Sequence, residues 1–231
     1  MPHSANRILN SLPQNILGAV EPHLKNVQLS FADVLAASGQ TIDRVYFPTG
    51  GIISLVVEMK IGDMIETAMV GRDGIANGMA ALDGKVSVHK AIVQVAGAGL
   101  AIDPERFRRL CDEFALLRAI IIRHEQFVLA QAQQSAGCNA IHTVEARMCR
   151  WLLRIRDLTG RDDMELTQEF LAQMLGVRRT SVSLVAGTLQ RAGLIAYRRG
   201  QIKLLDIEQL EEGACECVET VRSHYQRLLA V

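Results

Sequence analysis

Hydrophobic positions recur with different periods along the chain. Over residues 4–25 they recur every three to four positions, interrupted by Pro13 and Pro22, which predicts short helices. Over residues 27–101, short runs of β-branched and aromatic residues alternate with glycine turns. Five runs are predicted strands: 28–31, 44–47, 51–58, 64–70 and 89–95. Many short, evenly spaced strands are typical of a small antiparallel barrel or jelly-roll.

A long helical pattern follows, from Pro104 to Gly137. Such a helix between two domains is a natural dimerisation element. We therefore predict a homodimer seam, formed by Leu117, Ile120, Ile121, His124, Phe127, Val128 and Gln131. The alternative is that the helix packs on its own β-rich domain. A second helix is predicted over residues 138–157.

The stretch from Leu166 to Asp206 carries the most specific pattern. Gly176 is suited to a tight turn between two helices. The inward residues of these helices are Leu171, Ala172, Leu175, Val177, Val182 and Val185. The outward residues of the second helix are Arg178, Arg179, Thr180, Ser183 and Leu184. This arrangement predicts a helix-turn-helix whose second helix enters the DNA major groove, the alternative being an ordinary helical hairpin.

Two short strands are predicted after this helix, over residues 194–198 and 201–205, around Arg199-Gly200. A basic hairpin behind a helix-turn-helix makes a winged helix. Arg198 and Arg199 are its predicted phosphate contacts.

This order of motifs resembles the Crp/Fnr family of bacterial transcription regulators. The resemblance rests on Leu166-Thr167-Gln168-Glu169, Leu175-Gly176-Val177-Arg178-Arg179, Ala192-Gly193-Leu194-Ile195 and Gly200-Gln201-Ile202 ending at Asp206. Tyr46-Phe47-Pro48-Thr49-Gly50-Gly51 resembles a strand and turn of the family's β-roll sensor domain. The resemblance implies an α+β chain with a cyclic-nucleotide-binding-like β-roll at 1–110, a dimerisation helix at 111–137 and a winged helix-turn-helix domain at 138–231.

The same resemblance implies a function. A homodimer is expected to bind an inverted repeat in double-stranded DNA, with the helix at 179–191 in the major groove, and to contact RNA polymerase. In family members that read a G-T-G-A half-site, arginine, glutamate and arginine stand where this chain has Arg179, Thr180 and Leu184. Only the first is kept, so we expect Arg179 to contact a guanine and the half-site to differ.

Two further departures concern Arg178 and the sensor domain. Arg178 stands where a helix N-cap is usually Ser, Thr, Asp or Asn, so either a phosphate contact compensates or the cap moves to Thr180. In members that bind cyclic nucleotides, a glutamate stands where this chain has Ile75, and an arginine where it has His89 or Lys90. A cyclic nucleotide is therefore not expected; the effector is unknown, and no cofactor or metal is predicted.

Charge and cysteine content refine this interpretation. The formal net charge is zero, yet between residues 140 and 205 basic residues outnumber acidic ones by eleven to six. That segment has the basic character expected of a phosphate-binding surface. The five cysteines are scattered, the pair Cys215 and Cys217 is too short for a metal site by itself, and neither a signal peptide nor a membrane-spanning run is seen, which favours the cytoplasm. No catalytic motif points to an enzyme; the alternative function is a ligand-binding or protein-interaction module whose winged helix does not bind DNA.

Overall fold

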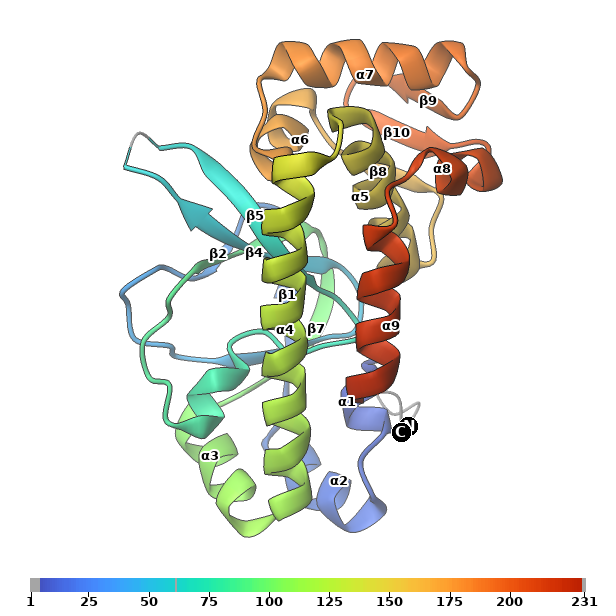
Figure 1. Ribbon diagram of the computed structural model, residues 1–231. Helices are drawn as coiled ribbons and strands as arrows, with labels where there is room; N and C mark the ends of the chain where they lie inside the picture. The colour runs from blue at the N-terminus through green and yellow to red at the C-terminus, as the bar shows by residue number, and fades with distance from the viewer. Residues whose placement is uncertain (1–4, 61, 230–231) are drawn as a thin grey trace.

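The computed structural model describes residues 5–60 and 62–229 (Figure 1). The N-terminal elements are α1 (Arg7–Asn10), α2 (Gln14–Val20), η1 (Glu21–His23), β1 (Lys25–Leu29), β2 (Val34–Ala36), β3 (Val45–Pro48), β4 (Ile52–Glu58), β5 (Met64–Val70), η2 (Gly78–Leu82), β6 (Lys90–Val95), β7 (Gly97–Ile102) and α3 (Pro104–Glu113). The remaining elements are α4 (Ala115–Ile141), α5 (Val144–Thr159), β8 (Asp163–Glu165), α6 (Gln168–Leu175), α7 (Arg179–Arg191), β9 (Ile195–Arg198), β10 (Gln201–Leu204), α8 (Ile207–Gly213) and α9 (Cys217–Leu229).

The N-terminal half is built on two antiparallel sheets, with strand orders β1-β7-β3 and β2-β6-β4-β5. Leu29 and Tyr46 from the first sheet share a core cluster with Ile53 and Val93 from the second. The predicted β-rich domain is therefore confirmed, with its strand ends shifted by up to three residues.

Strands β2 and β7 were not predicted. The sequence of β7, Gly97-Ala98-Gly99-Leu100-Ala101-Ile102, is mostly glycine and alanine, which are poor strand formers. It nevertheless pairs with both β1 and β3, because its small residues allow close backbone approach. A Cβ atom on Gly99 would lie 3.2 Å from the carbonyl oxygen of Phe47.

The expected single helical stretch from Pro104 is two helices. The side chain of Asp103 caps α3 by accepting from the backbone N–H of Arg106 at 2.8 Å. Phe114, with φ −113° and ψ 96°, separates α3 from α4. The long helix therefore begins at Ala115 and ends at Ile141, rather than spanning 111–137.

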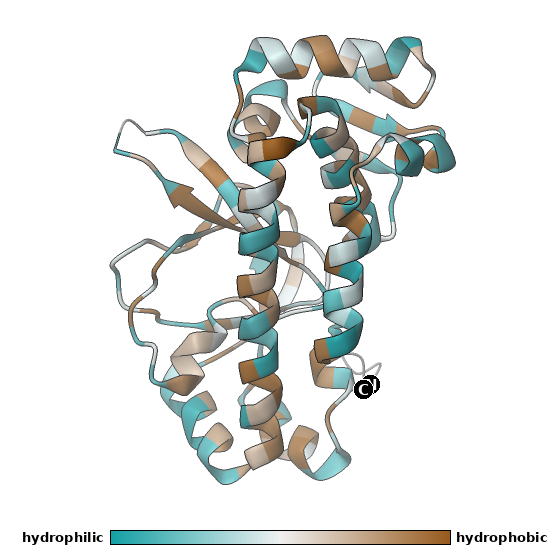
Figure 2. Ribbon diagram, viewed as in Figure 1, coloured by the Kyte–Doolittle hydropathy of each residue, from teal (hydrophilic) through white to brown (hydrophobic). Residues whose placement is uncertain are grey.

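The seam predicted on α4 faces the inside of the protomer. Leu117, Ile120, Ile121, His124, Phe127 and Gln131 are buried within the single chain, and Val128 is half-buried. These residues pack on the chain's own β-rich half and on α9, so in this structure they are not available to a second subunit. The physical reason is that α4 carries apolar residues along its whole length, as its recurring brown segments in Figure 2 show. Some are buried, such as Leu117, and some are exposed, such as Ile122, and periodicity does not say which side meets which neighbour.

Helix α9 covers part of this inner face of α4. It lies alongside α4 and runs in the opposite direction (Figure 1), and the Phe127 and Tyr225 rings meet edge to face at 5.5 Å. Val221 and Leu229 belong to a cluster formed mostly by the N-terminal half. The C-terminal tail, whose role the sequence did not reveal, thus returns to the N-terminal half.

The C-terminal half packs against the first. Its core cluster contains Trp151, Leu171 and Val182 together with Ile52 and Met69 of the β-rich half. Its small sheet has the order β8-β10-β9. Strand β8, which was not predicted, is three residues long and pairs with β10. None of the helices within the described ranges has the length and apolar content needed to cross a membrane.

Candidate nucleic-acid interface

Helices α6 and α7 form the predicted helix-turn-helix. The hydroxyl of Thr167 caps α6 by accepting from the N–H of Phe170 at 3.1 Å. Gly176 ends α6 with φ 61°, a left-handed conformation in which glycine has no Cβ penalty. A Cβ atom at Gly176 would also lie 3.1 Å from the side chain of Ile65 on β5, so the turn packs closely on the sensor half.

Of the residues predicted to face inward from the second helix, Val182 is buried, and Val177 and Val185 are partly buried against the same core. Ala186 and Leu189, which were not predicted, are also buried. All seven predicted DNA-contacting side chains are exposed: Arg178, Arg179, Thr180, Ser183, Leu184, Arg198 and Arg199. Leu184 is 69% exposed, an unusual position for leucine unless another surface covers it.

Arg178 is the N-cap residue of α7, and no side-chain hydrogen bond caps the helix. Of the two alternatives, a cap at Arg178 and a cap displaced to Thr180, the structure has the first. The free N–H groups and the helix dipole at this exposed end favour an anion.

Gln168 is a further residue of this surface that the sequence did not single out. Its Oε1 accepts from the hydroxyl of Ser183 at 2.6 Å, so the start of α6 is tied to the outward face of α7. The polar pair spans two helices, and no spacing rule within one helix indicates it.

The wing is a two-residue hairpin between β9 and β10. Arg199 and Gly200 both have positive φ, 52° and 78°, as a type I′ turn requires. Arg198 and Arg199, at the turn between β9 and β10, are both exposed to solvent. Within the described ranges, no carboxylate forms an ion pair with Arg178, Arg179, Arg198 or Arg199.

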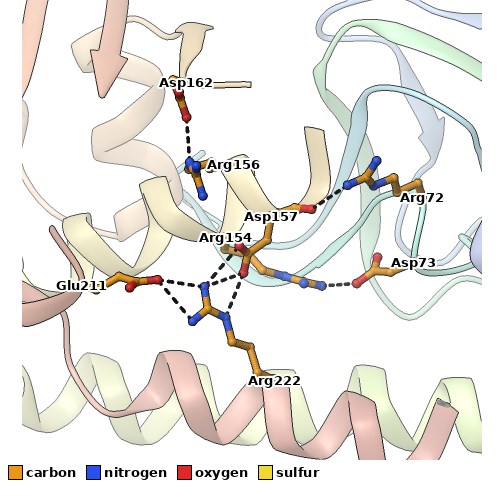
Figure 3. Close-up of polar contacts among 8 residues, drawn as sticks. All are labelled: Arg72, Asp73, Arg154, Arg156, Asp157, Asp162, Glu211 and Arg222. Carbon is orange, nitrogen blue, oxygen red and sulfur yellow. Dashed lines mark hydrogen bonds and ion pairs between the residues drawn. The ribbon is translucent and has the colours of Figure 1, made fainter. Parts of the chain in front are cut away.

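Several other basic residues between positions 140 and 205 do not belong to the interface, although they contribute to the positive charge of that segment. Arg154 on α5 pairs with the buried Asp73 of the sensor half at 2.6 Å. Arg156 pairs with Asp162 at 2.7 Å (Figure 3). The guanidinium of Arg147 donates to the carbonyl of Leu175 at the end of α6. Sequence charge alone does not separate such internal partners from free cations.

A network of ion pairs and hydrogen bonds links the two halves and α9 (Figure 3). Arg222 of α9 contacts Asp157 at 3.0 Å and Glu211 at 3.4 Å. The guanidinium of Arg72 donates to the carbonyl of Asp157 at 3.4 Å. Together with the Asp73–Arg154 pair, these contacts hold α5 against both the sensor half and the C-terminal helix.

Glu66 forms a second link between the β-rich N-terminal half and the C-terminal half. Its carboxyl accepts from the indole N–H of Trp151 at 2.9 Å and contacts the Ser54 hydroxyl at 2.6 Å. Burial raises the pKa of Glu66 from 4.5 to about 7, since desolvation outweighs these hydrogen bonds and the charges of Arg150 and Arg154. Ser54 also contacts Gln94 Oε1; its single hydroxyl hydrogen cannot serve both contacts, and both are satisfied when a protonated Glu66 donates to the Ser54 oxygen.

The segment between Gly71 and Gly78, which follows β5, packs directly on α4. The side chain of Ile75 is buried, and its backbone N–H donates to Nε2 of His124 at 3.0 Å. Lys90, one of the two positions expected to replace the family's arginine, instead pairs with Glu58 at 3.3 Å. Apolar packing thus occupies the place where the resemblance puts the glutamate of cyclic-nucleotide-binding members.

Comparisons with known proteins agree with this architecture. Residues 146–212 match the family model of a Crp-like helix-turn-helix domain. FixK2 from Bradyrhizobium japonicum has a similar structure, with a TM-score of 0.70 and 14% identity over 83% of this chain and 98% of FixK2. The c-di-GMP responsive global regulator CLP of Xanthomonas campestris has a TM-score of 0.67 and 16% identity over 84% of this chain and 100% of CLP. A CRP/FNR family regulator of Thermus thermophilus has a TM-score of 0.63 and 26% identity over 82% of this chain and 98% of that regulator. No curated protein sequence matches the chain.

The matched domain and the fold define the class: a chain with a Crp-like helix-turn-helix domain at residues 146–212 and the fold of solved transcription regulators. Solved structures of Crp/Fnr family regulators share the fold of the chain, as its sequence motifs suggested.

Proposed function

We propose that this regulator binds an inverted repeat in double-stranded DNA as a homodimer, with the N-terminal half of α7 in each major groove. The observation that carries the proposal is the set of exposed arginines without acidic partners at the start of α7 and on the wing. In the rest of the segment, Arg154, Arg156 and Arg161 are paired with carboxylates. Cations that lack internal partners are the ones free to replace the counterions of phosphates.

Individual contacts follow from the exposed face. Arg179 is placed to donate to the edge of a guanine, a contact worth about 1–3 kcal/mol of discrimination. Leu184 offers an apolar contact suited to a thymine methyl group, and Thr180 offers a hydroxyl. Arg178, Arg198 and Arg199 then contact phosphates. The half-site differs from G-T-G-A, because Thr180 and Leu184 carry neither the carboxylate nor the guanidinium of the family pattern.

The dimer contact lies on the outward face of α4 rather than on the seam predicted from sequence. Ile122 and Leu129 are about half exposed there. Ile122 and Leu129 are seven residues apart, and Ala119, Ala136 and other small or polar exposed positions continue the same stripe. A stripe with heptad spacing on a long helix matches a second copy of itself. Half-sites about 34–36 Å apart are expected from such a dimer.

The effector is proposed to be something other than a cyclic nucleotide, because the buried side chain of Ile75 cannot accept a hydrogen bond from a ribose hydroxyl. Contact with RNA polymerase is proposed only from the resemblance to transcription regulators.

Selection from a random duplex library with purified protein tests the proposal. The salt concentration is set at about 100 mM, so that binding through phosphates alone is weakened. An enriched inverted repeat supports DNA binding by a dimer without effector. If no sequence is enriched, either in buffer or with added cell extract, the winged helix does not read DNA and the proposal fails.

Variants separate the two kinds of contact. Arg179→Ala should lose preference at one base pair of each half-site, whereas Arg199→Ala should weaken binding to all sequences and reduce the salt slope by about 1 per contact. Arg118→Ala, which removes a half-exposed arginine at the far end of α4, is the matched control and should change neither. Loss of specificity at unchanged affinity in Arg199→Ala would contradict the phosphate assignment.

A further inference from the structure

Four potential metal ligands converge where α4 ends and α9 begins. Cys138 lies in the last turn of α4, and His142 is the residue that caps this helix. Cys215 precedes α9, and Cys217 is its first residue. The three sulfur atoms and a ring nitrogen of His142 all lie within 4.8 Å of one another. The three thiols are buried, and His142 is partly exposed.

Two of the separations are close to those around a tetrahedral ion. Zinc bonds of about 2.3 Å to sulfur and about 2.05 Å to nitrogen put two sulfurs about 3.8 Å apart, and a sulfur and a nitrogen about 3.6 Å apart. The sulfur atoms of Cys138 and Cys215 are 3.6 Å apart. The sulfur of Cys217 lies 3.6 Å from Nδ1 of His142.

The surroundings also suit a metal. Nε2 of His142 lies 3.1 Å from a carboxylate oxygen of Glu216, which leaves Nδ1 directed at the cysteines. A carboxylate behind a ligating histidine fixes its tautomer and ring orientation. The amide of Gln134 donates to the sulfur of Cys217 at 2.9 Å, a contact that favours a thiolate.

Charge balance is consistent with three thiolates. With a divalent ion the cluster would carry one net negative charge. Arg147 and Arg150, in the first half of α5, lie close enough to Cys138 for their positive charges to act on it. Two nearby cations offset the single excess negative charge.

We propose that Cys138, His142, Cys215 and Cys217 bind one Zn²⁺ ion. Three thiolates and one imidazole form a closed structural set, with no position left for a reacting water. Soft thiolate ligands in tetrahedral geometry select zinc over magnesium or calcium. The ion joins the start of α9 to the junction between α4 and α5, where the sensor half meets the DNA-binding domain.

A disulfide between Cys138 and Cys215 is the competing chemistry. It needs the two sulfurs at about 2.05 Å, well below the observed separation. It also gives no role to Cys217, His142 or Glu216, whereas the metal uses all three.

Metal content of the reduced full-length protein tests the proposal directly. We expect one zinc per chain after loading and desalting, measured by atomic emission and by competition with a chromophoric chelator. Cobalt(II) replaces zinc as a spectroscopic probe: intense visible bands and sulfur-to-cobalt charge transfer are expected for tetrahedral thiolate ligation. The cobalt measurement uses the unaltered chain, so it does not depend on whether a variant folds.

Variants locate the site. Cys217→Ser and His142→Ala should abolish stoichiometric zinc binding, and Glu216→Ala should weaken it by about 10- to 100-fold. Cys111→Ala, which removes a buried cysteine in α3 far from the cluster, is the matched control and should bind zinc normally. Binding that survives in His142→Ala and Cys217→Ser, or is lost in Cys111→Ala, overturns the assignment.

Two other results overturn it. One is reduced protein that binds neither zinc nor cobalt. The other is a Cys138–Cys215 disulfide found by mass spectrometry together with absence of metal binding after reduction, which would make the pair a redox site. None of these measurements involves DNA, so a negative result for zinc binding can be distinguished from a negative result for the proposed DNA binding.

Discussion

Replacement of Glu66 by glutamine should remove a pH dependence from the stability of the protein. Glutamine has the shape of the protonated carboxyl group, accepts from the indole of Trp151 through its oxygen and donates to Ser54 through its amide. It is therefore a permanent copy of the neutral state that burial favours. The folded structure should be unchanged, and only the proton equilibrium should disappear.

The magnitude follows from the pKa. Folding raises the pKa of Glu66 from 4.5 to about 7, so between these values the folded state binds more protons than the unfolded state. Stability from this group is then fully present below pH 4.5, falls as the pH rises from 4.5 to about 7, and stays low above. The difference in pKa corresponds to about 3 kcal/mol at most, at 1.36 kcal/mol per unit.

The assay uses the single tryptophan of the chain, which is the partner of Glu66. Trp151 fluorescence of the native wild type should titrate with a midpoint near pH 7, and that of Glu66→Gln should not. Between pH 5 and pH 8, urea unfolding should show the free energy of unfolding of the wild type falling by about 2–3 kcal/mol more than that of Glu66→Gln. Glu58→Gln, which alters a more exposed glutamate on the neighbouring strand, is the control and should behave as wild type. Parallel stability profiles for wild type and Glu66→Gln would refute the reasoning.

Three further predictions concern the dimer, the turn and the link between domains. Leu129→Glu should turn the proposed dimer into a monomer in analytical ultracentrifugation. Val88→Glu, at another exposed apolar position, should leave the dimer intact. If both variants are dimers, the outward face of α4 is not the dimer contact. Gly176→Ala should lower the free energy of unfolding by about 1–3 kcal/mol, because alanine is strained at φ 61°, and an unchanged urea midpoint would contradict this. Asp73→Ala should destabilise the protein by about 3–5 kcal/mol, because it leaves the largely buried Arg154 charge without its partner, whereas the double replacement with Arg154→Met should recover much of the loss.

The winged helix could be predicted from the sequence because its determinants are local. Gly176 sets the turn, the spacing of apolar residues sets the inner faces, and Arg199-Gly200 sets the hairpin, all within about 40 residues. Each depends on backbone conformations and periods that neighbouring residues determine. For the same reason the seven outward side chains could be named before the structure was known, and all of them are exposed.

Which face of α4 meets which partner was not determined by the sequence. The helix is apolar on two sides, and the inner side is covered by segments distant in sequence, including α9. A period of 3.6 residues defines a stripe but not its neighbour. The predicted seam was therefore assigned to a second subunit, although Leu117 and Ile121 pack within the protomer.

The polar chemistry was likewise decided by tertiary structure. Cys138 and Cys215 are 77 residues apart, and Glu66 and Trp151 are 85 apart, so no spacing rule connects them. Their environment depends on long-range packing: burial raises the pKa of Glu66 to about 7, and the return of α9 brings the cysteines together. The sequence by itself determined the local elements and the exposed face of the helix-turn-helix; the tertiary structure determined which side chains meet across the two halves, because desolvation and proximity exist only after the chain has folded.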